Sequence, residues 1–177
     1  MKVLLHTCCA PCASHCAWTL MDSGHDVTLF YSNANIYPNE EWEKRLESVQ
    51  RLADHYTLPL IVDRPTHEEW LEHVAVGYEQ EPERGIRCTR CFQYNLARTY
   101  AKALEEGFDF FTTCLTVSPH KSSASIFEVG RALSSTHFLA IDFKKEDGFK
   151  KCLALSEQLN LYRQSYCGCE FSIKPVS

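Results

Sequence analysis

The stretch KVLLHTCCAPCASHCAWTLMDSG, residues 2–24, reads as a strand, a turn and a helix. Residues 2–5, which contain the apolar run VLL, predict a buried strand, and Pro11 suits the first turn of a helix that stops near Gly24. In nucleotide-binding folds that begin in this way, the turn is glycine-rich so that backbone N–H groups can approach a phosphate. Here the turn has three thiols and no glycine. We therefore expect a sulfur-ligated cofactor at the usual ligand site of the fold.

The alternation of strand and helix continues along the chain. We expect further strands at 25–32, 58–63, 108–115 and 137–142, and helices at 38–56, 66–76, 91–107, 122–133 and 147–160. This order predicts an α/β fold with a Rossmann-like parallel sheet and helices on both faces, whose ligands bind beyond the carboxyl ends of the strands. No linker or repeat divides the sequence, so we expect residues 1–177 to form a single domain.

Composition limits the class of protein. The chain has 177 residues and a net charge of −5, and no window resembles a membrane span or a secretory signal. Its 10 cysteines are too few for a secreted disulfide scaffold, but in a reducing compartment such density indicates metal binding or redox chemistry. We expect a cytoplasmic protein with no membrane partner. An RNA partner would need a local basic patch, because the net charge repels phosphate.

Two pairs of cysteines are the candidate metal ligands. Cys8 and Cys9 lie just ahead of a helix N-terminus, which favours the thiolate form. Cys88 and Cys91 form a C-x-x-C motif at the start of a later helix. Four thiolates can hold a 4Fe-4S cluster or a structural zinc. A closed zinc site usually stabilises a small domain that lacks a hydrophobic core, and this chain has enough apolar residues to form one. We therefore favour redox iron over zinc or over inert buried thiols.

The C-G-C motif near the end of the chain indicates a separate redox function. In an extended segment, Cys167 and Cys169 would project from the same face. Their α-carbons would lie about 6.6 Å apart, near the upper limit for a disulfide, so a bridge would be strained and easily reduced. We therefore interpret the pair as a redox-active dithiol, with metal ligands or ordinary tail cysteines as the alternatives.

Other residues fall at the expected site edge. Cys12 follows the first two thiols closely, and the hydroxyls and cation of 116–121 could hold a phosphate or a ribose, although an ordinary N-cap turn would look the same. Cys16, Cys114 and Cys152 are expected to pack in the core. The additional active-site candidates are Cys12, Asn33, Asn35, Ser118, His120 and Lys121.

Five motifs together resemble the QueH family of cobalamin-independent epoxyqueuosine reductases. They are HTCCAPC (6–12), NANIYPNEEWEKR (33–45), RCTRC (87–91), TVSPHK (116–121) and YRQSYCGCEFS (162–172). The resemblance implies a fold like that of adenine-nucleotide alpha hydrolases and an iron-sulfur cluster. It also implies the last step of queuosine synthesis in tRNA, in which the epoxide oxygen is removed to leave a cyclopentene.

The resemblance also implies roles for particular residues. Cys8, Cys9, Cys88 and Cys91 match the cluster ligands of the family, and Cys167 and Cys169 match its redox-active disulfide pair. The family is said to hold an adjacent mononuclear iron, whose ligands the motifs do not assign. Implied partners are tRNA with epoxyqueuosine in the anticodon loop and a small electron-donor protein. The sequence departs from the family pattern at Cys16 and at Cys114, where threonine is commoner.

Two alternative functions fit parts of the sequence. A zinc-stabilised RNA-binding module would need only the four candidate ligands, and a metal-free thiol-disulfide oxidoreductase would need only Cys167 and Cys169. Metal analysis under anaerobic conditions separates both alternatives from an iron-sulfur reductase.

Overall fold

A four-stranded parallel sheet forms the centre of the computed structural model, which describes residues 1–174. The strand order is β3-β2-β1-β4, so β1 is paired on both sides and all carboxyl ends meet at one edge. This confirms the expected α/β fold class. The strands are β1 (Lys2–His6), β2 (Asp26–Tyr31), β3 (Leu60–Val62) and β4 (Phe110–Thr113).

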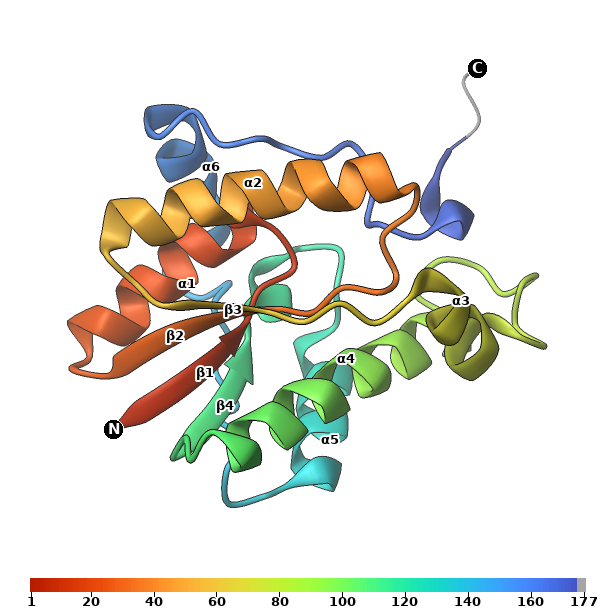
Figure 1. Ribbon diagram of the computed structural model, residues 1–177, viewed down its shortest axis with the longest axis horizontal. Coiled ribbons are helices and arrows are strands. Elements are labelled where there is room, and N and C mark those ends of the chain that lie inside the picture. Colours follow the sequence, from red (N-terminus) through yellow and green to blue (C-terminus); the bar gives the residue numbers. More distant parts are fainter. Residues whose placement is uncertain (175–177) are drawn as a thin grey trace.

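Helices cover both faces of the sheet, as Figure 1 shows. On one face lie α1 (Ala10–Asp22), α2 (Asn39–Tyr56) and α6 (Gly148–Gln158), and on the other lie α4 (Ile86–Glu105) and α5 (Ser123–Leu133). The short α3 (His67–Trp70) continues as a π-helical turn over Leu71–Ala75.

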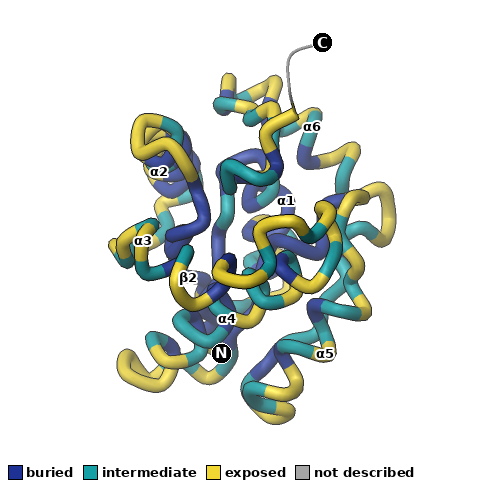
Figure 2. Tube along the Cα trace, turned by 90° about the vertical axis from the view of Figure 1, so that its right-hand side faces the viewer, coloured by how far each residue is buried: buried dark blue, intermediate teal, exposed yellow. Residues whose placement is uncertain are grey.

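Successive residues of the strands supply the two cores. Val3 and Leu5 of β1 pack against the α1 and α2 face, whereas Leu4 between them packs against the α4 and α5 face. Both faces of β1 are therefore buried, which explains why 3–5 is continuously apolar rather than alternating. Figure 2 shows the buried trace inside and the exposed residues on the outer sides of the helices.

The expected fifth strand at 137–142 is not formed, which is a correction to the sequence reading. This segment makes only an isolated bridge, in which Phe138 pairs with Phe111 of β4. Beyond this bridge, the backbone carbonyls of the segment accept hydrogen bonds from side chains instead of from a neighbouring strand. The Thr112 hydroxyl donates to the carbonyl of Leu139, and the Thr116 hydroxyl donates to that of Ile141. The segment thus follows the sheet edge without extending the sheet.

Two other element boundaries differ from expectation. The strand expected at 108–115 ends at Thr113, where the Thr113 hydroxyl accepts a hydrogen bond from the Leu115 N–H and starts a 3-10 helix over Cys114–Val117. The helix expected from residue 91 begins earlier, at Ile86, and so contains the whole C-x-x-C motif.

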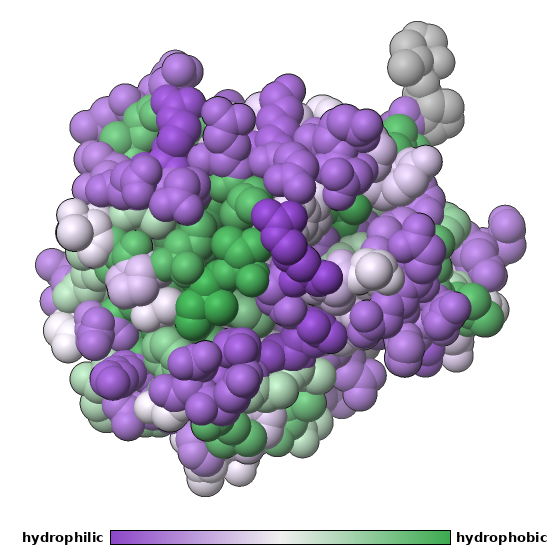
Figure 3. Space-filling view, viewed as in Figure 1, coloured by the Kyte–Doolittle hydropathy of each residue, from purple (hydrophilic) through white to green (hydrophobic). Residues whose placement is uncertain are grey.

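The surface of the sheet edge at β3 is apolar. The three residues of β3 are half-buried, and Figure 3 shows hydrophobic surface in this region between the hydrophilic side chains above and below it. Among residues 1–174, no helix is both long and apolar enough to cross a membrane.

An ion pair fixes α4 relative to the end of β3. Arg98 of α4 donates two hydrogen bonds to the Asp63 carboxylate, at 2.7 and 3.0 Å, and the Ser32 hydroxyl donates a third at 2.7 Å. Partial burial opposes ionisation of Asp63, but the hydrogen bonds from Arg98 and Ser32 outweigh it and lower its pKa. Since α4 carries Cys88 and Cys91, this pair helps to position one part of the candidate site.

We predict that Asp63→Asn lowers the free energy of unfolding at pH 7 by about 1 kcal/mol, because the pair is only partly screened from solvent. A carboxyl whose pKa is lowered on folding stabilises the protein above its unfolded pKa, and this stabilisation is lost as the pH falls through the folded value. The difference between wild type and variant should therefore shrink in denaturant titrations from pH 6 towards pH 3. Asp22→Asn, which changes an exposed carboxyl on α1, is the control and should have little effect at either pH.

Candidate functional site

The first thiol group, Cys8, Cys9, Cys12 and Cys114, lies where β1 and β4 end. The sulfurs of Cys8, Cys9 and Cys12 all lie within 4.8 Å of one another, with 3.8 Å between those of Cys8 and Cys9. Cys9 is the N-cap of α1, and its sulfur accepts the Cys12 N–H at 3.4 Å. Cys114 joins the group from the end of β4, with its sulfur 3.5 Å from that of Cys8. The group therefore has the close spacing of sulfurs that a metal site requires.

The surroundings of the first thiol group favour one thiolate. Hydrogen bonds from Cys114, Cys12 and Cys9 hold the pKa of Cys8 well below its usual value, and the positive charge of Lys121 adds to the effect. Hydrogen bonding to Cys8 and Cys9 raises the pKa of Cys12, and burial raises the pKa of Cys114. Of these thiols, Cys8 is therefore the one most readily ionised.

The second thiol group, Cys88, Cys91, Cys167 and Cys169, lines a cleft of about 120 Å³. Cys88 and Cys91 come from the first turns of α4, and the other two come from the C-terminal segment. Burial raises the pKa of both Cys88 and Cys91. All four are free thiols. Basic side chains also line this cleft, namely Arg84, Arg87, His120 and Lys121.

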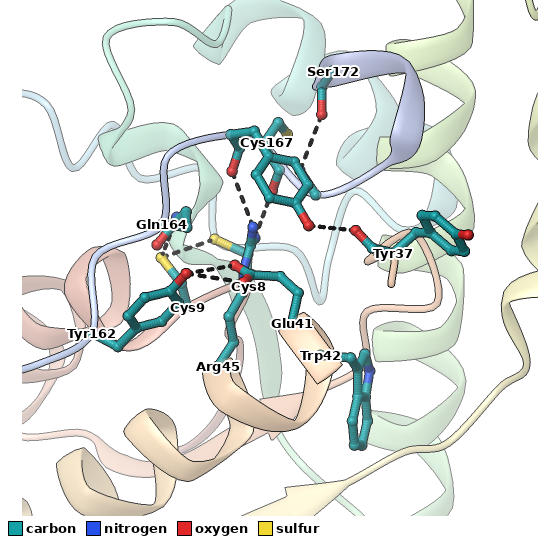
Figure 4. Close-up of polar contacts among 12 residues, drawn as sticks. Cys8, Cys9, Tyr37, Glu41, Trp42, Arg45, Tyr162, Gln164, Cys167 and Ser172 are labelled. Atoms are coloured by element: carbon teal, nitrogen blue, oxygen red, sulfur yellow. Dashed lines mark hydrogen bonds and ion pairs between the residues drawn. The ribbon is translucent and has the colours of Figure 1, made fainter. Parts of the chain in front are cut away.

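Lys121 and the C-terminal segment connect the two thiol groups. Burial opposes the charge of Lys121, but its interactions with the thiols of Cys167, Cys8 and Cys12 outweigh this effect and raise its pKa. Gln164 of the C-terminal segment donates its amide N–H to the sulfur of Cys9 at 3.1 Å. Figure 4 shows Gln164 beside Cys9 and the same segment continuing to Cys167. Lys121 and this segment therefore lie beside both groups, although among the described residues only Cys8, Cys9 and Cys12 have the mutual spacing of metal ligands.

The buried guanidinium of Arg45 anchors this segment. Arg45 lies on α2 with its side chain 1% exposed, and donates to the carbonyls of Cys167 at 2.7 Å and Tyr166 at 3.0 Å. It also pairs with Glu41 at 2.8 Å, so its charge is balanced. Gly168 then comes so close to the loop after β2 that an added Cβ would lie 2.8 Å from the Asn35 amide nitrogen. The position of Cys167 is thus fixed through its backbone.

Two buried polar atoms in the second cleft are without hydrogen-bond partners in the described part of the chain. They are Nε1 of Trp70, which has only the Cys91 sulfur beside it, and Nε of Arg87. Because buried polar groups are normally satisfied, unpaired donors around a cleft favour a ligand with acceptor atoms.

The structure places the remaining sequence candidates in different roles. Asn35, His120 and Lys121 line the second cleft. Asn33 is buried and donates to the Thr7 carbonyl at 2.9 Å, which makes it a brace for the loop after β2. Ser118 accepts the backbone N–H of His120 at 3.3 Å, and so caps the turn that leads to the cleft.

Sequence reasoning missed several members of the site. Cys114 was expected in the core and is buried there, but its sulfur also contacts Cys8. Gln164 and Arg45 belong to motifs of the resemblance, yet neither has a residue type that by itself indicates a site. Only the return of the C-terminal segment across α2 gives them their roles, and no local pattern in the sequence predicts that contact.

Comparison with known proteins identifies similar sequences over almost the whole chain. A family model described as "Epoxyqueuosine reductase QueH" matches residues 3–175. A protein of Streptococcus pyogenes with this name is 36% identical, over 98% of this chain and 71% of its own length. Proteins of the same name from Acinetobacter baylyi and Thermotoga maritima are 38% and 34% identical, over 82% and 90% of their lengths.

A solved structure shows the same fold. The U34-tRNA thiolase NcsA from Methanococcus maripaludis, solved with its [4Fe-4S] cluster, is similar with a TM-score of 0.57 at 11% sequence identity. The match covers 98% of this chain and 62% of the thiolase. At this identity the likeness concerns the fold alone.

We predict that Arg45→Met releases the C-terminal segment. Methionine fills similar space but donates no hydrogen bond, so the carbonyls of Tyr166 and Cys167 lose their partner and the unfolding free energy falls by about 3 kcal/mol. Hydrogen exchange across 162–169 and alkylation of Cys167 should both become faster in the metal-free protein. Arg51→Met, an exposed change on the same helix, is the matched control. Unchanged exchange in Arg45→Met would show that other contacts hold the segment.

Proposed function

The chain belongs to the epoxyqueuosine reductase QueH family, and we propose that its two thiol groups carry out the reduction of epoxyqueuosine to queuosine in tRNA. The observation that carries the proposal is the gathering of both groups, under one C-terminal segment, at the carboxyl edge of the sheet. The matched family extends over residues 3–175, so every element of this site lies within it. On this proposal, residues 1–177 act as one iron-sulfur reductase domain.

The thiols fit an iron-sulfur centre. We assign Cys8, Cys9, Cys88 and Cys91 as ligands of a 4Fe-4S cluster, two from each thiol group. A single ion with metal–sulfur bonds of about 2.3 Å brings its thiolates to about 3.8 Å from one another, whereas a cluster of several irons separates them further. The close set of Cys8, Cys9 and Cys12 therefore also suits an adjacent mononuclear iron, with Cys12 as the added ligand.

Residues of the chain supply hydrogen bonds to the ligand sulfurs. Gln164 donates to Cys9 at 3.1 Å, and the Asn95 amide lies 3.7 Å from the sulfur of Cys91. Such donors stabilise the thiolate form and tune the reduction potential of a bound cluster. When bound, the cluster supplies electrons one at a time.

The C-G-C pair suits the stoichiometry of the reaction. Removing an epoxide oxygen as water breaks two C–O bonds and consumes two electrons and two protons. Oxidation of the Cys167 and Cys169 thiols to a disulfide releases two electrons and two protons, so the pair can supply one turnover. A small electron-donor protein then returns the pair to the dithiol state. Both thiols line the cleft that contains Cys88 and Cys91, so electrons would travel only a short distance from the dithiol to these two cluster ligands.

The second cleft suits an RNA substrate. The chain carries a net charge of −5, yet Arg84, Arg87, His120 and Lys121 gather at this cleft. Arg84, His120 and Lys121 provide the local basic surface that an acidic protein needs to bind a phosphate backbone, whereas Arg87 is buried and donates to backbone carbonyls. A tRNA-modifying reductase with reduced thiols belongs in the cytoplasm. The family assignment favours this function over a zinc-stabilised RNA-binding module or a metal-free thiol-disulfide oxidoreductase.

The proposal predicts that anaerobically purified protein contains iron, has a broad visible absorption band, and removes one oxygen from epoxyqueuosine in tRNA when a reductant is supplied. Nucleoside mass analysis of the digested tRNA measures the product. Cys88→Ala should lose both the band and the activity, because a cluster ligand is missing. Cys152→Ala removes a buried thiol outside the assigned ligands and should keep both.

Other results would contradict particular parts of the proposal. A colourless wild type with stoichiometric zinc would exclude the cluster. Activity that survives chelation and requires only Cys167 and Cys169 would favour the metal-free alternative. A Cys169→Ser variant that keeps the band and turns over at the wild-type rate would exclude the dithiol as the electron source.

A further inference from the structure

A second hollow lies beside the thiol site and is not used by the proposed reaction. It has a volume of about 380 Å³ and is formed by the loops that follow β2 and β3. Its lining includes the aromatic rings of Tyr37, Trp42 and His67 and the cationic side chain of Arg64. This size is within the range of ligand sites in proteins.

One loop separates this hollow from the thiol cleft. The Ile36 N–H donates to the Asn33 carbonyl at 3.1 Å and closes a turn. Of the residues in that turn, Ala34 lines the hollow and Asn35 lines the thiol cleft. A single chain segment therefore forms the wall between the two sites. A single-stranded RNA that crosses this wall can place neighbouring nucleotides in the two sites.

Three neighbouring rings lead from the core to the hollow. Trp70 is 1% exposed and stacks on His67 with ring centres 5.5 Å apart. His67 in turn contacts Tyr37 in a tilted arrangement at 5.3 Å, and Tyr37 is 47% exposed. A further flat ring could therefore stack on the exposed part of the Tyr37 ring.

The backbone that carries the exposed ring of Tyr37 is held in place. The Tyr37 N–H donates to the Gly168 carbonyl at 2.9 Å, and the Tyr37 carbonyl accepts from the Tyr166 hydroxyl. His67 is fixed as well, because its ring nitrogens contact the Ala34 carbonyl at 2.7 Å and Glu170 at 3.0 Å. Figure 4 shows the Tyr37 ring on the side of its loop away from Cys8 and Cys9. An exposed aromatic ring on a fixed backbone is a platform for stacking, since the chain that carries it does not have to be ordered on binding.

Arg64 adds a planar cation to the same hollow. Its guanidinium lies 4.6 Å from the ring centre of Trp42. The pairing of Arg64 with Glu43 is exposed, at 61% and 50% for the two side chains, so it restrains the guanidinium weakly. Arginine stacked on an aromatic ring can contact both a base and a phosphate.

We propose that this hollow binds the base of a nucleotide that adjoins epoxyqueuosine in the RNA, stacked on Tyr37 and contacted by Arg64. The proposal rests on the proposed function, because it requires an RNA substrate in the thiol cleft. It gives the enzyme a second point of attachment beside the reacting nucleotide. Aromatic stacking combined with a cation accepts any base, so the subsite recognises single-stranded RNA rather than a particular sequence.

The test uses an anticodon stem-loop that contains epoxyqueuosine, with the fluorescent base 2-aminopurine placed immediately before or after it. Stacking quenches 2-aminopurine. We expect one of the two probes to be quenched on binding to the reconstituted wild-type protein. Tyr37→Ala should abolish the quenching, and Tyr37→Phe, which keeps the ring, should preserve it.

Binding and turnover of the same RNA provide the second readout. Loss of one stacked base should raise the KM for the stem-loop roughly tenfold in Tyr37→Ala, with kcat retained. Arg64→Ala should raise the KM as well. Arg51→Ala, an exposed arginine on α2 without a contact to the hollow, is the matched control and should behave as wild type.

The two proposals fail in different ways. If wild type reduces the RNA but quenches neither probe, or if Tyr37→Ala has the wild-type KM, the subsite is wrong and the reductase assignment stands. If a probe is quenched by wild type and released in Tyr37→Ala but no oxygen is lost from the RNA, the subsite stands and the reaction is wrong.

Discussion

One buried guanidinium joins the parts of the chain on which the candidate site depends. Arg45 lies in the interior of α2 and binds two successive carbonyls of the C-terminal segment, so the segment must cross the carboxyl edge of the sheet at that point. Without water to take over these hydrogen bonds, the alternative is a buried guanidinium that keeps only its pairing with Glu41 and has two unpaired N–H groups, which is unfavourable. The contact therefore fixes the path of residues 162–169, and with it the distance of Gln164 and Cys167 from the thiols of the sheet.

The parallel sheet supplies the rest of the arrangement. Since β1 lies between β2 and β4, the loops after all three strands open to the same edge. The thiols after β1, the thiol after β4 and the asparagines after β2 thus meet, although they are separated by about a hundred residues. The site then combines sulfur from several segments with a cation, Lys121, whose charge stabilises the thiolate of Cys8. Clustered thiolates would otherwise repel one another.

The sequence predicted the class of fold because its apolar segments alternate clearly, and it predicted the site edge because parallel strands share one. The prediction of a strand at 137–142 was wrong. The apolar pattern of a strand is present there, but the carbonyls of Leu139 and Ile141 accept hydrogen bonds from the hydroxyls of Thr112 and Thr116. The sequence analysis also assigned Cys114 to the core alone, because a sequence does not distinguish a buried cysteine from a buried cysteine that contacts Cys8. The Arg45 contact joins residues more than a hundred positions apart, and such contacts depend on the packing of whole elements.

The turn after β2 limits how this region of the chain can change. Its ends are tied, at Asn33 to the Thr7 carbonyl and at Tyr37 to the Gly168 carbonyl. An insertion or deletion of one residue between those ties would rotate the side chains and exchange which of them faces sulfur and which faces the neighbouring hollow. The tie at Asn33 is made by its side-chain amide, whereas the tie at Tyr37 is made by the backbone. The architecture therefore holds constant the number of residues in this segment and the identity of Asn33.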